Sequence, residues 1–203
     1  MILYVTKKTK ERFDFPLLEE LQLDRQATAM HILEKEKDIP VFMWALKIFY
    51  FDRRKCLQVM NFSSNFCIFL IDVRVKDIPN IGNMIGTYLG IMYQDDKEML
   101  RLLDCYFNES PVAFFDVLKD RSMISYLNNN ELTFLDNGYR LYDFLSDGIM
   151  HSIELNKKYN FDYLVSKKIN GQQEYFQTSE KFKEILQDRY RKVEKNMIFK
   201  KYK

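Results

Sequence analysis

The fold is decided by the stretch Trp44-Ala45-Leu46-Lys47-Ile48-Phe49-Tyr50-Phe51, which is aromatic and prone to form a β-strand. A polar reversal follows at Asp52-Arg53-Arg54-Lys55, and a second strand is expected over Cys56–Asn61. After a turn at Phe62–Asn65, the apolar run Phe66–Val73 is typical of a third strand. This order predicts a three-stranded antiparallel meander.

In the first and third of these strands, both the odd and the even positions are apolar, so apolar and polar residues do not alternate. Successive side chains of a strand point to opposite faces of a sheet, so both faces should be covered, with helices on at least one side. Ile2–Val5 is a further β-prone run. We therefore predict an α+β fold with an antiparallel sheet of three to five strands covered by helices.

The remaining elements are predicted from helical periodicity and turn residues. The predicted order is a helical stripe over Ile81–Met92, helical segments at Glu98–Phe107 and Val112–Leu118, a loop at Asn128–Asn130, a short strand at Leu132–Leu135, a long amphipathic helix over Tyr139–Tyr159 and a final helix starting at Thr178 or Ser179.

Length and composition favour one globular unit with an appendage. The chain has 203 residues, of which 47% are hydrophobic, and this is ample for a core without disulfide or metal staples. We assign residues 1–175 to a single α+β domain and residues 176–203 to a basic amphipathic helix that packs on it or serves a partner. No apolar run approaches the roughly 20 residues that cross a bilayer, so we expect a soluble, cytoplasmic protein without a membrane partner.

The three cysteines are expected to be reduced packing residues. Their odd number and the absence of a Cys-x-x-Cys pair suit the cytosol. A hairpin through Phe62–Asn65 would place Cys67 opposite Met60, which disfavours a disulfide with Cys56.

The formal charge of +2 hides an asymmetry along the chain. Residues 181–203 hold nine Lys/Arg and three Asp/Glu, which gives +6, whereas residues 1–180 carry −4. The tail cations Arg189, Arg191, Lys192 and Lys195 are candidates for binding nucleic acid or a partner. The alternative is an amphipathic helix that packs on the core and ends in a basic segment.

A second basic candidate is the predicted hairpin turn with Arg53, Arg54 and Lys55. A projecting basic turn suits phosphate binding, because arginine offers bidentate hydrogen bonds to phosphate oxygens. The alternative is a solvated turn whose cations keep a sheet edge soluble.

On a helix over Tyr139–Tyr159, one narrow face would carry five charged or titratable side chains. They are Arg140, Asp143, Asp147, His151 and Glu154. Carboxylates and histidine are the residue types of metal-dependent hydrolases and nucleases, which makes these residues the catalytic candidates. The alternative is a solvated face with charge pairs at i, i+3 and i, i+4. We assign no metal or cofactor, since one helix rarely closes a metal site.

The chain resembles an uncharacterised bacterial domain-of-unknown-function family found as small stand-alone proteins in bacteria and mobile elements. The matching segments of the first block are Thr6-Lys7-Lys8, Trp44, Arg53-Arg54-Lys55 and Met60-Asn61. The second block, an Asn-Arg-Ser turn before a helix, is matched only by Thr133, Arg140 and Asp147. The resemblance covers roughly residues 1–160, and the tail has no counterpart in it. It implies an α+β architecture and almost nothing about activity.

Established catalytic signatures are absent from the sequence. There is no glycine-rich phosphate loop, no Gly-x-Ser-x-Gly elbow and no His-Glu-x-x-His motif. Our leading hypothesis is a non-enzymatic interaction protein of bacterial, phage or plasmid origin, with anti-CRISPR-like counter-defence inhibitors of a protein or nucleoprotein target as one instance. We expect a protein partner or a homo-oligomer. The alternatives are the hydrolase or nuclease outlined above and a nucleic-acid-binding protein.

Overall fold

A five-stranded mixed sheet forms the centre of the protein, in the strand order β4-β3-β2-β1-β5. The computed structural model describes residues 1–203 except 137, 139, 141–142, 144, 147–148, 151, 170 and 202–203, with the backbone alone at 132–136, 145–146, 149–150, 168–169 and 192–201. The strands of the sheet are β1 Ile2–Val5, β2 Met43–Phe51, β3 Arg54–Asn61, β4 Cys67–Leu70 and β5 Phe114–Val117.

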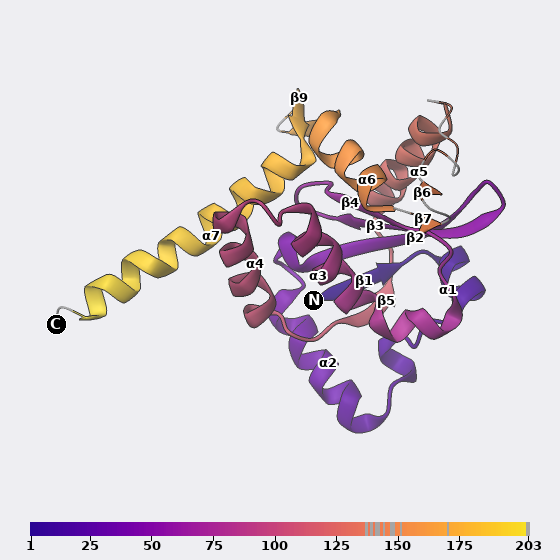
Figure 1. Ribbon diagram of the computed structural model, residues 1–203. Helices are drawn as coiled ribbons and strands as arrows, with labels where there is room; N and C mark the ends of the chain where they lie inside the picture. Colours follow the sequence, from indigo (N-terminus) through magenta and orange to yellow (C-terminus); the bar gives the residue numbers. More distant parts are fainter. Residues whose placement is uncertain are drawn as a thin grey trace.

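Helices surround this sheet, and two small ribbons lie outside it (Figure 1). The helices are α1 Lys7–Phe13, α2 Leu23–Glu36, α3 Ile81–Met92, α4 Lys97–Glu109, α5 Arg121–Asp136, α6 Ser152–Lys157 and α7 Thr178–Lys201, with the short turns η1 Leu18–Glu20, η2 Pro40–Phe42, η3 Val75–Asn80 and the π-helical turn η5 Lys158–Asp162. The ribbons pair β6 Leu145–Ser146 with β7 Ile149–Met150, and β8 Leu164–Ile169 with β9 Gln172–Gln177. No helix in the described part of the chain is both long and apolar enough to span a bilayer.

The predicted meander is confirmed. Strands β2, β3 and β4 pair antiparallel, and Met60 is the register partner of Cys67, as the hairpin geometry predicts. The α+β class is also confirmed. The sheet is mixed, not purely antiparallel, because β1 runs parallel to both of its neighbours, β2 and β5. Strand direction depends on the crossovers through helices, and the residue pattern of a strand does not encode it.

Three of the elements predicted before residue 137 are wrong. The segment Val112–Leu118 contains strand β5 and not a helix, since it pairs with β1 in the sheet. The predicted loop at Asn128–Asn130 and strand at Leu132–Leu135 both belong to the long helix α5. Asparagine has a low helix propensity, but burial of Met123 and Leu127 against the sheet outweighs it.

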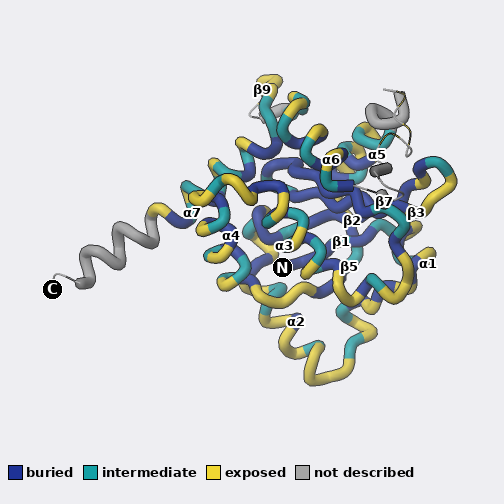
Figure 2. The backbone as a smooth tube through the Cα atoms, viewed as in Figure 1, coloured by how far each residue is buried: buried dark blue, intermediate teal, exposed yellow. Residues whose placement is uncertain are grey.

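Both faces of the sheet are covered, as the apolar strands predict (Figures 1 and 2). On one face Leu46, Ile48 and Leu57 pack with buried residues of α3, α4 and the first half of α7. On the other face Ala45 and Phe49 pack with residues of α5, α6 and η5. The two faces of the sheet are therefore not accessible to a ligand.

The edge strand β4 is closed by two asparagine side chains. Asn160 Oδ1 accepts the Cys67 N–H at 2.9 Å, and its Nδ2 donates to the Cys67 carbonyl at 2.7 Å. Asn156 makes the same pair of bonds with Phe69, at 2.7 and 3.1 Å. One turn of α6 and η5 thus replaces a further strand, and it satisfies the backbone groups that an edge strand leaves unpaired.

We expect Asn160→Ala to lower the free energy of unfolding by about 2–4 kcal/mol, because it leaves a buried N–H and a buried carbonyl without partners. Urea unfolding followed by circular dichroism measures this. Asn83→Ala, at an exposed position of α3, is the matched control and should change stability by less than about 0.5 kcal/mol. Equal effects of the two substitutions would contradict the role of Asn160.

Candidate functional site

The turn between β2 and β3 presents its charged side chains to solvent. Asp52 and Arg53 have φ values of 44° and 67°, and the register closes at Phe51 and Arg54. This left-handed pair fits the right-handed twist of a two-residue hairpin, although glycine and asparagine usually occupy it. Arg53, Arg54 and Lys55 are all exposed, as expected.

The cations of the turn differ in their partners. Arg54 and Arg74 share the carboxylate of Asp72, at 3.6 and 3.7 Å. Arg140 lies 3.7 Å from the carboxylate of Asp52. By contrast, Arg53 and Lys55 have no ionic partner among the described residues.

Helix α1 lies beside this hairpin. Thr6 caps the helix by accepting the Thr9 N–H at 3.3 Å, and Thr9 Oγ1 accepts the Ile48 N–H of β2 at 2.7 Å. Strand β1 ends at Val5. Beyond this end, the Thr9 hydroxyl takes the place of β1 as the hydrogen-bond partner of β2. The helix is thereby fixed against the part of β2 that leads to the turn.

A hollow of about 350 Å³ lies between α1 and β2 and is lined by Lys8, Glu11, Arg12, Ile48 and Tyr50. Lys55 is the cross-strand partner of Tyr50 and therefore stands on the same face of the hairpin. Lys8 and Arg12 are exposed and, like Arg53 and Lys55, have no ionic partner in the described part of the chain. We call the set Lys8, Arg12, Tyr50, Arg53 and Lys55 the basic face.

Sequence reasoning identifies only Arg53 and Lys55 of this basic face as functional. Tyr50 stands in an apolar run, and nothing in the run distinguishes it from its buried neighbours. Lys8 is singled out only by the Thr-Lys-Lys resemblance. Thr6 precedes a helical run and is an N-cap signal, which indicates that Lys8 and Arg12 belong to one short helix.

The predicted helix over Tyr139–Tyr159 is wrong. Within it, β6 and β7 pair as a short ribbon, and α6 begins only at Ser152. A single charged face required a continuous helix at 100° per residue, and the described residues of this segment do not form one.

Of the five catalytic candidates, the structure describes Arg140, Asp143 and Glu154. Arg140 and Asp143 are both exposed, and the Arg140 N–H donates to the Asp143 carboxylate at 3.0 Å. Glu154 is exposed on α6, while Asp147 and His151 lie outside the described residues. Among the residues that the structure describes, no three His, Cys, Asp or Glu side chains form a group that could hold a metal ion.

The cysteine thiols do not form a reactive centre in the described structure. Cys56 and Cys67 are buried, whereas Cys105 is half-buried. Burial raises the pKa of Cys56 to about 11 and raises that of Cys67 further. Both thiols are therefore protonated at neutral pH, and the thiolate is the nucleophilic form.

The described half of the basic tail holds α7 against α4. The Arg189 guanidinium forms a bidentate ion pair with Glu109, with Nε at 2.9 Å from the carboxylate, and it lies 4.8 Å from the centre of the Phe42 ring. Arg191 lies 3.9 Å from Glu98. The side chains of Lys192 and Lys195 lie outside the described residues. Arg189 thus has an intramolecular role.

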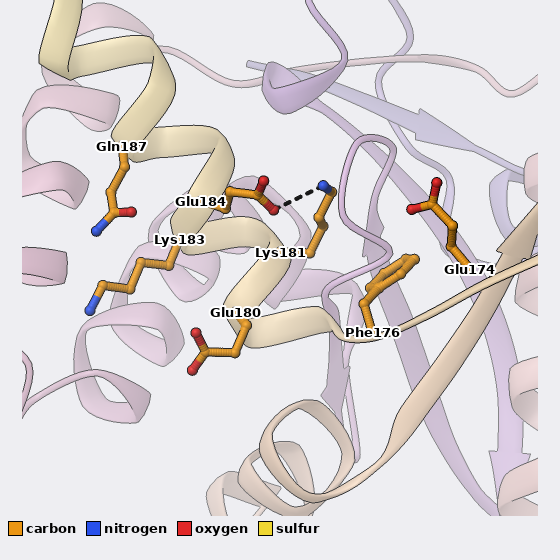
Figure 3. A pocket seen from close by; sticks show the side chains of 7 residues that line it. All are labelled: Glu174, Phe176, Glu180, Lys181, Lys183, Glu184 and Gln187. Atoms are coloured by element: carbon orange, nitrogen blue, oxygen red, sulfur yellow. Dashed lines mark hydrogen bonds and ion pairs between the residues drawn. The ribbon is translucent and has the colours of Figure 1, made fainter. Parts of the chain in front are cut away.

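A second hollow, of about 590 Å³, runs along the start of α7 beside β9 (Figure 3). Its charged side chains do not converge. Lys183 and Gln187 point to one side of α7, while Lys181 lies on the other side and points towards the Glu184 carboxylate. Lys181 pairs with Glu184 at 2.9 Å, and Lys183 pairs with Asp96. The hollow therefore does not have the geometry of a reaction centre.

A family model for a domain of unknown function, DUF6933, matches residues 2–200. The chain belongs to the DUF6933 family. The expected resemblance to an uncharacterised family is confirmed, and its extent is corrected, because the match continues beyond residue 160 through the tail. No curated protein and no solved structure matches the sequence.

In this DUF6933 chain, the ion pair of Arg189 holds the pKa of Glu109 below its ordinary value of 4.5. Because the folded-state pKa is the lower one, the ion pair stabilises the fold fully above pH 4.5 and loses this effect as the pH falls through the folded-state value. We expect Glu109→Gln to cost about 1–2 kcal/mol at pH 7 and to flatten the acid dependence of stability.

Thermal unfolding between pH 3 and pH 7 measures this difference. The control is Glu19→Gln, which removes an exposed carboxylate without an ion pair in the described structure. A Glu109→Gln variant with the wild-type pH dependence would show that the ion pair does not anchor α7.

Proposed function

We propose that this DUF6933 chain binds nucleic acid through the basic face. The observation that carries the proposal is the convergence of three segments at one end of the sheet. Helix α1 supplies Lys8, Glu11 and Arg12, and β2 supplies Tyr50. Lys55 of β3 is the cross-strand partner of Tyr50, and Arg53 lies in the adjoining turn. Cations on one surface with an exposed aromatic ring among them are the usual composition of a nucleic-acid-binding surface.

The electrostatic balance supports the proposal. Lys8, Arg12, Arg53 and Lys55 lack ionic partners in the described structure, whereas Arg189 in the tail is paired. A cation that is not engaged within the protein gives up no ion pair when it meets a phosphate, and it releases the counterions of the nucleic acid. The basic face is therefore a better phosphate-binding surface than the described half of the tail.

Other roles from the sequence stay predictions. The proposal is compatible with a protein or nucleoprotein target, including a counter-defence target, and with a homo-oligomer. The basic face does not include α2, whose exposed side is available for such contacts. A hydrolase or nuclease based on Asp143, Asp147, His151 and Glu154 no longer has the single helix face that suggested it.

We expect the double variant Arg53→Gln/Lys55→Gln to weaken binding to a labelled oligonucleotide and to flatten the plot of log K against log salt. The slope should fall by about 0.7–0.9 for each phosphate that the variant no longer neutralises. Arg54→Gln should change the slope less, because Arg54 shares Asp72 with Arg74. Fluorescence anisotropy at several salt concentrations gives the slopes.

The control is Lys37→Gln/Lys97→Gln, which removes the same charge at exposed positions on other helices, at the end of α2 and the start of α4. Equal slopes for the two double variants would mean that net charge, and not the basic face, determines binding. No binding of the wild type at low salt would refute the proposed function.

A further inference from the structure

Tyr50 departs from the burial pattern of its own strand. It is 42% exposed, whereas Ile48, two residues earlier on the same face, is 3% exposed. The other residues of β2 are buried or half-buried. A large aromatic side chain left exposed in an otherwise buried strand offers apolar area to a ligand without any rearrangement of the fold.

The surroundings of the ring combine two kinds of chemistry. Ile48 and the Tyr50 ring make the hollow partly apolar, while Lys8, Arg12 and Glu11 line it from α1. Lys8 and Arg12 are one helical turn apart, about 6 Å along the helix axis. This separation is comparable with that of neighbouring phosphates on an extended strand. Lys55 adds a cation beside the ring on the hairpin.

We infer that the hollow receives an unpaired base stacked on Tyr50, so that the ligand of the basic face is single-stranded nucleic acid. This inference rests on the proposed function. In a duplex the faces of the bases are stacked on one another, and only their edges and the phosphates are accessible. The Tyr50 ring, which lines the hollow beside α1, therefore meets the face of a base only where the base is unpaired.

Glu11 favours a base over a phosphate inside the hollow. Glu11 lines the hollow beside the cations, and the ammonium of Lys7 lies 4.0 Å from its carboxylate. A carboxylate repels a phosphate but accepts a hydrogen bond from the exocyclic amino group of a base. The phosphates of the bound strand accordingly lie towards Lys8, Arg12 and Lys55.

The test compares a short labelled single strand with a duplex of the same sequence, by fluorescence anisotropy at one low salt concentration. The variants are Tyr50→Leu and Tyr50→Phe, and the control is Tyr175→Leu, at a tyrosine of β9 that is 69% exposed. Tyr50→Leu should weaken single-strand binding roughly 5- to 100-fold, the effect of removing one base–aromatic stack. Tyr50→Phe keeps a stacking face and should retain most of the affinity.

The outcomes separate this inference from the proposed function. Duplex binding should be weaker than single-strand binding in the wild type and unchanged by Tyr50→Leu. If both ligands bind and Tyr50→Leu changes neither, or weakens both equally, the stacking inference is overturned while phosphate binding stands. If neither ligand binds the wild type, the proposed function itself fails.

Discussion

The structure depends on the burial of strand β2 from both sides. Trp44, Leu46 and Ile48 face the cluster built with α3, α4 and α7, while Ala45 and Phe49 face the cluster built with α5 and α6. A strand that is apolar on both faces is stable only when two helical layers cover it. The positions of the helices around the sheet follow from this requirement, and Trp44 fixes α4 further through the hydrogen bond from Nε1 to the Tyr106 hydroxyl, at 2.9 Å.

The same requirement explains where a ligand can bind. The two faces are covered by helices, and the edges are protected as well: asparagine side chains pair with β4, and Leu17 bridges Phe115 at the opposite edge. The hairpin of β2 and β3 continues past the end of β1, and there the short helix α1 lies beside it on the side of Ile48 and Tyr50. Lys8, Arg12 and Lys55 gather around the exposed Tyr50 ring on this side of the hairpin, whereas Phe49 and Phe51 are buried on the other side.

The candidate site could be predicted in part. Arg53, Arg54 and Lys55 could be assigned to an exposed turn because a polar reversal between two apolar strands must project. The prediction of a single charged helix face over Tyr139–Tyr159 was wrong. Helical periodicity is informative only where the chain stays helical, and the β6–β7 ribbon interrupts the predicted helix. Arg189 belongs to a region of high positive charge, but charge counting does not show that Glu109, far away in sequence, neutralises it.

The sequence by itself determined the meander, its register at Met60 and Cys67, the need to cover both of its faces, and the basic turn. Only the tertiary structure decided the parallel placement of β1, the closure of β4 by Asn156 and Asn160, and the meeting of Lys8 and Arg12 with Tyr50. The physical reason is that periodicity encodes the side to which a residue points. It does not encode which element, if any, covers that side, and so it could not show that Tyr50 stays exposed.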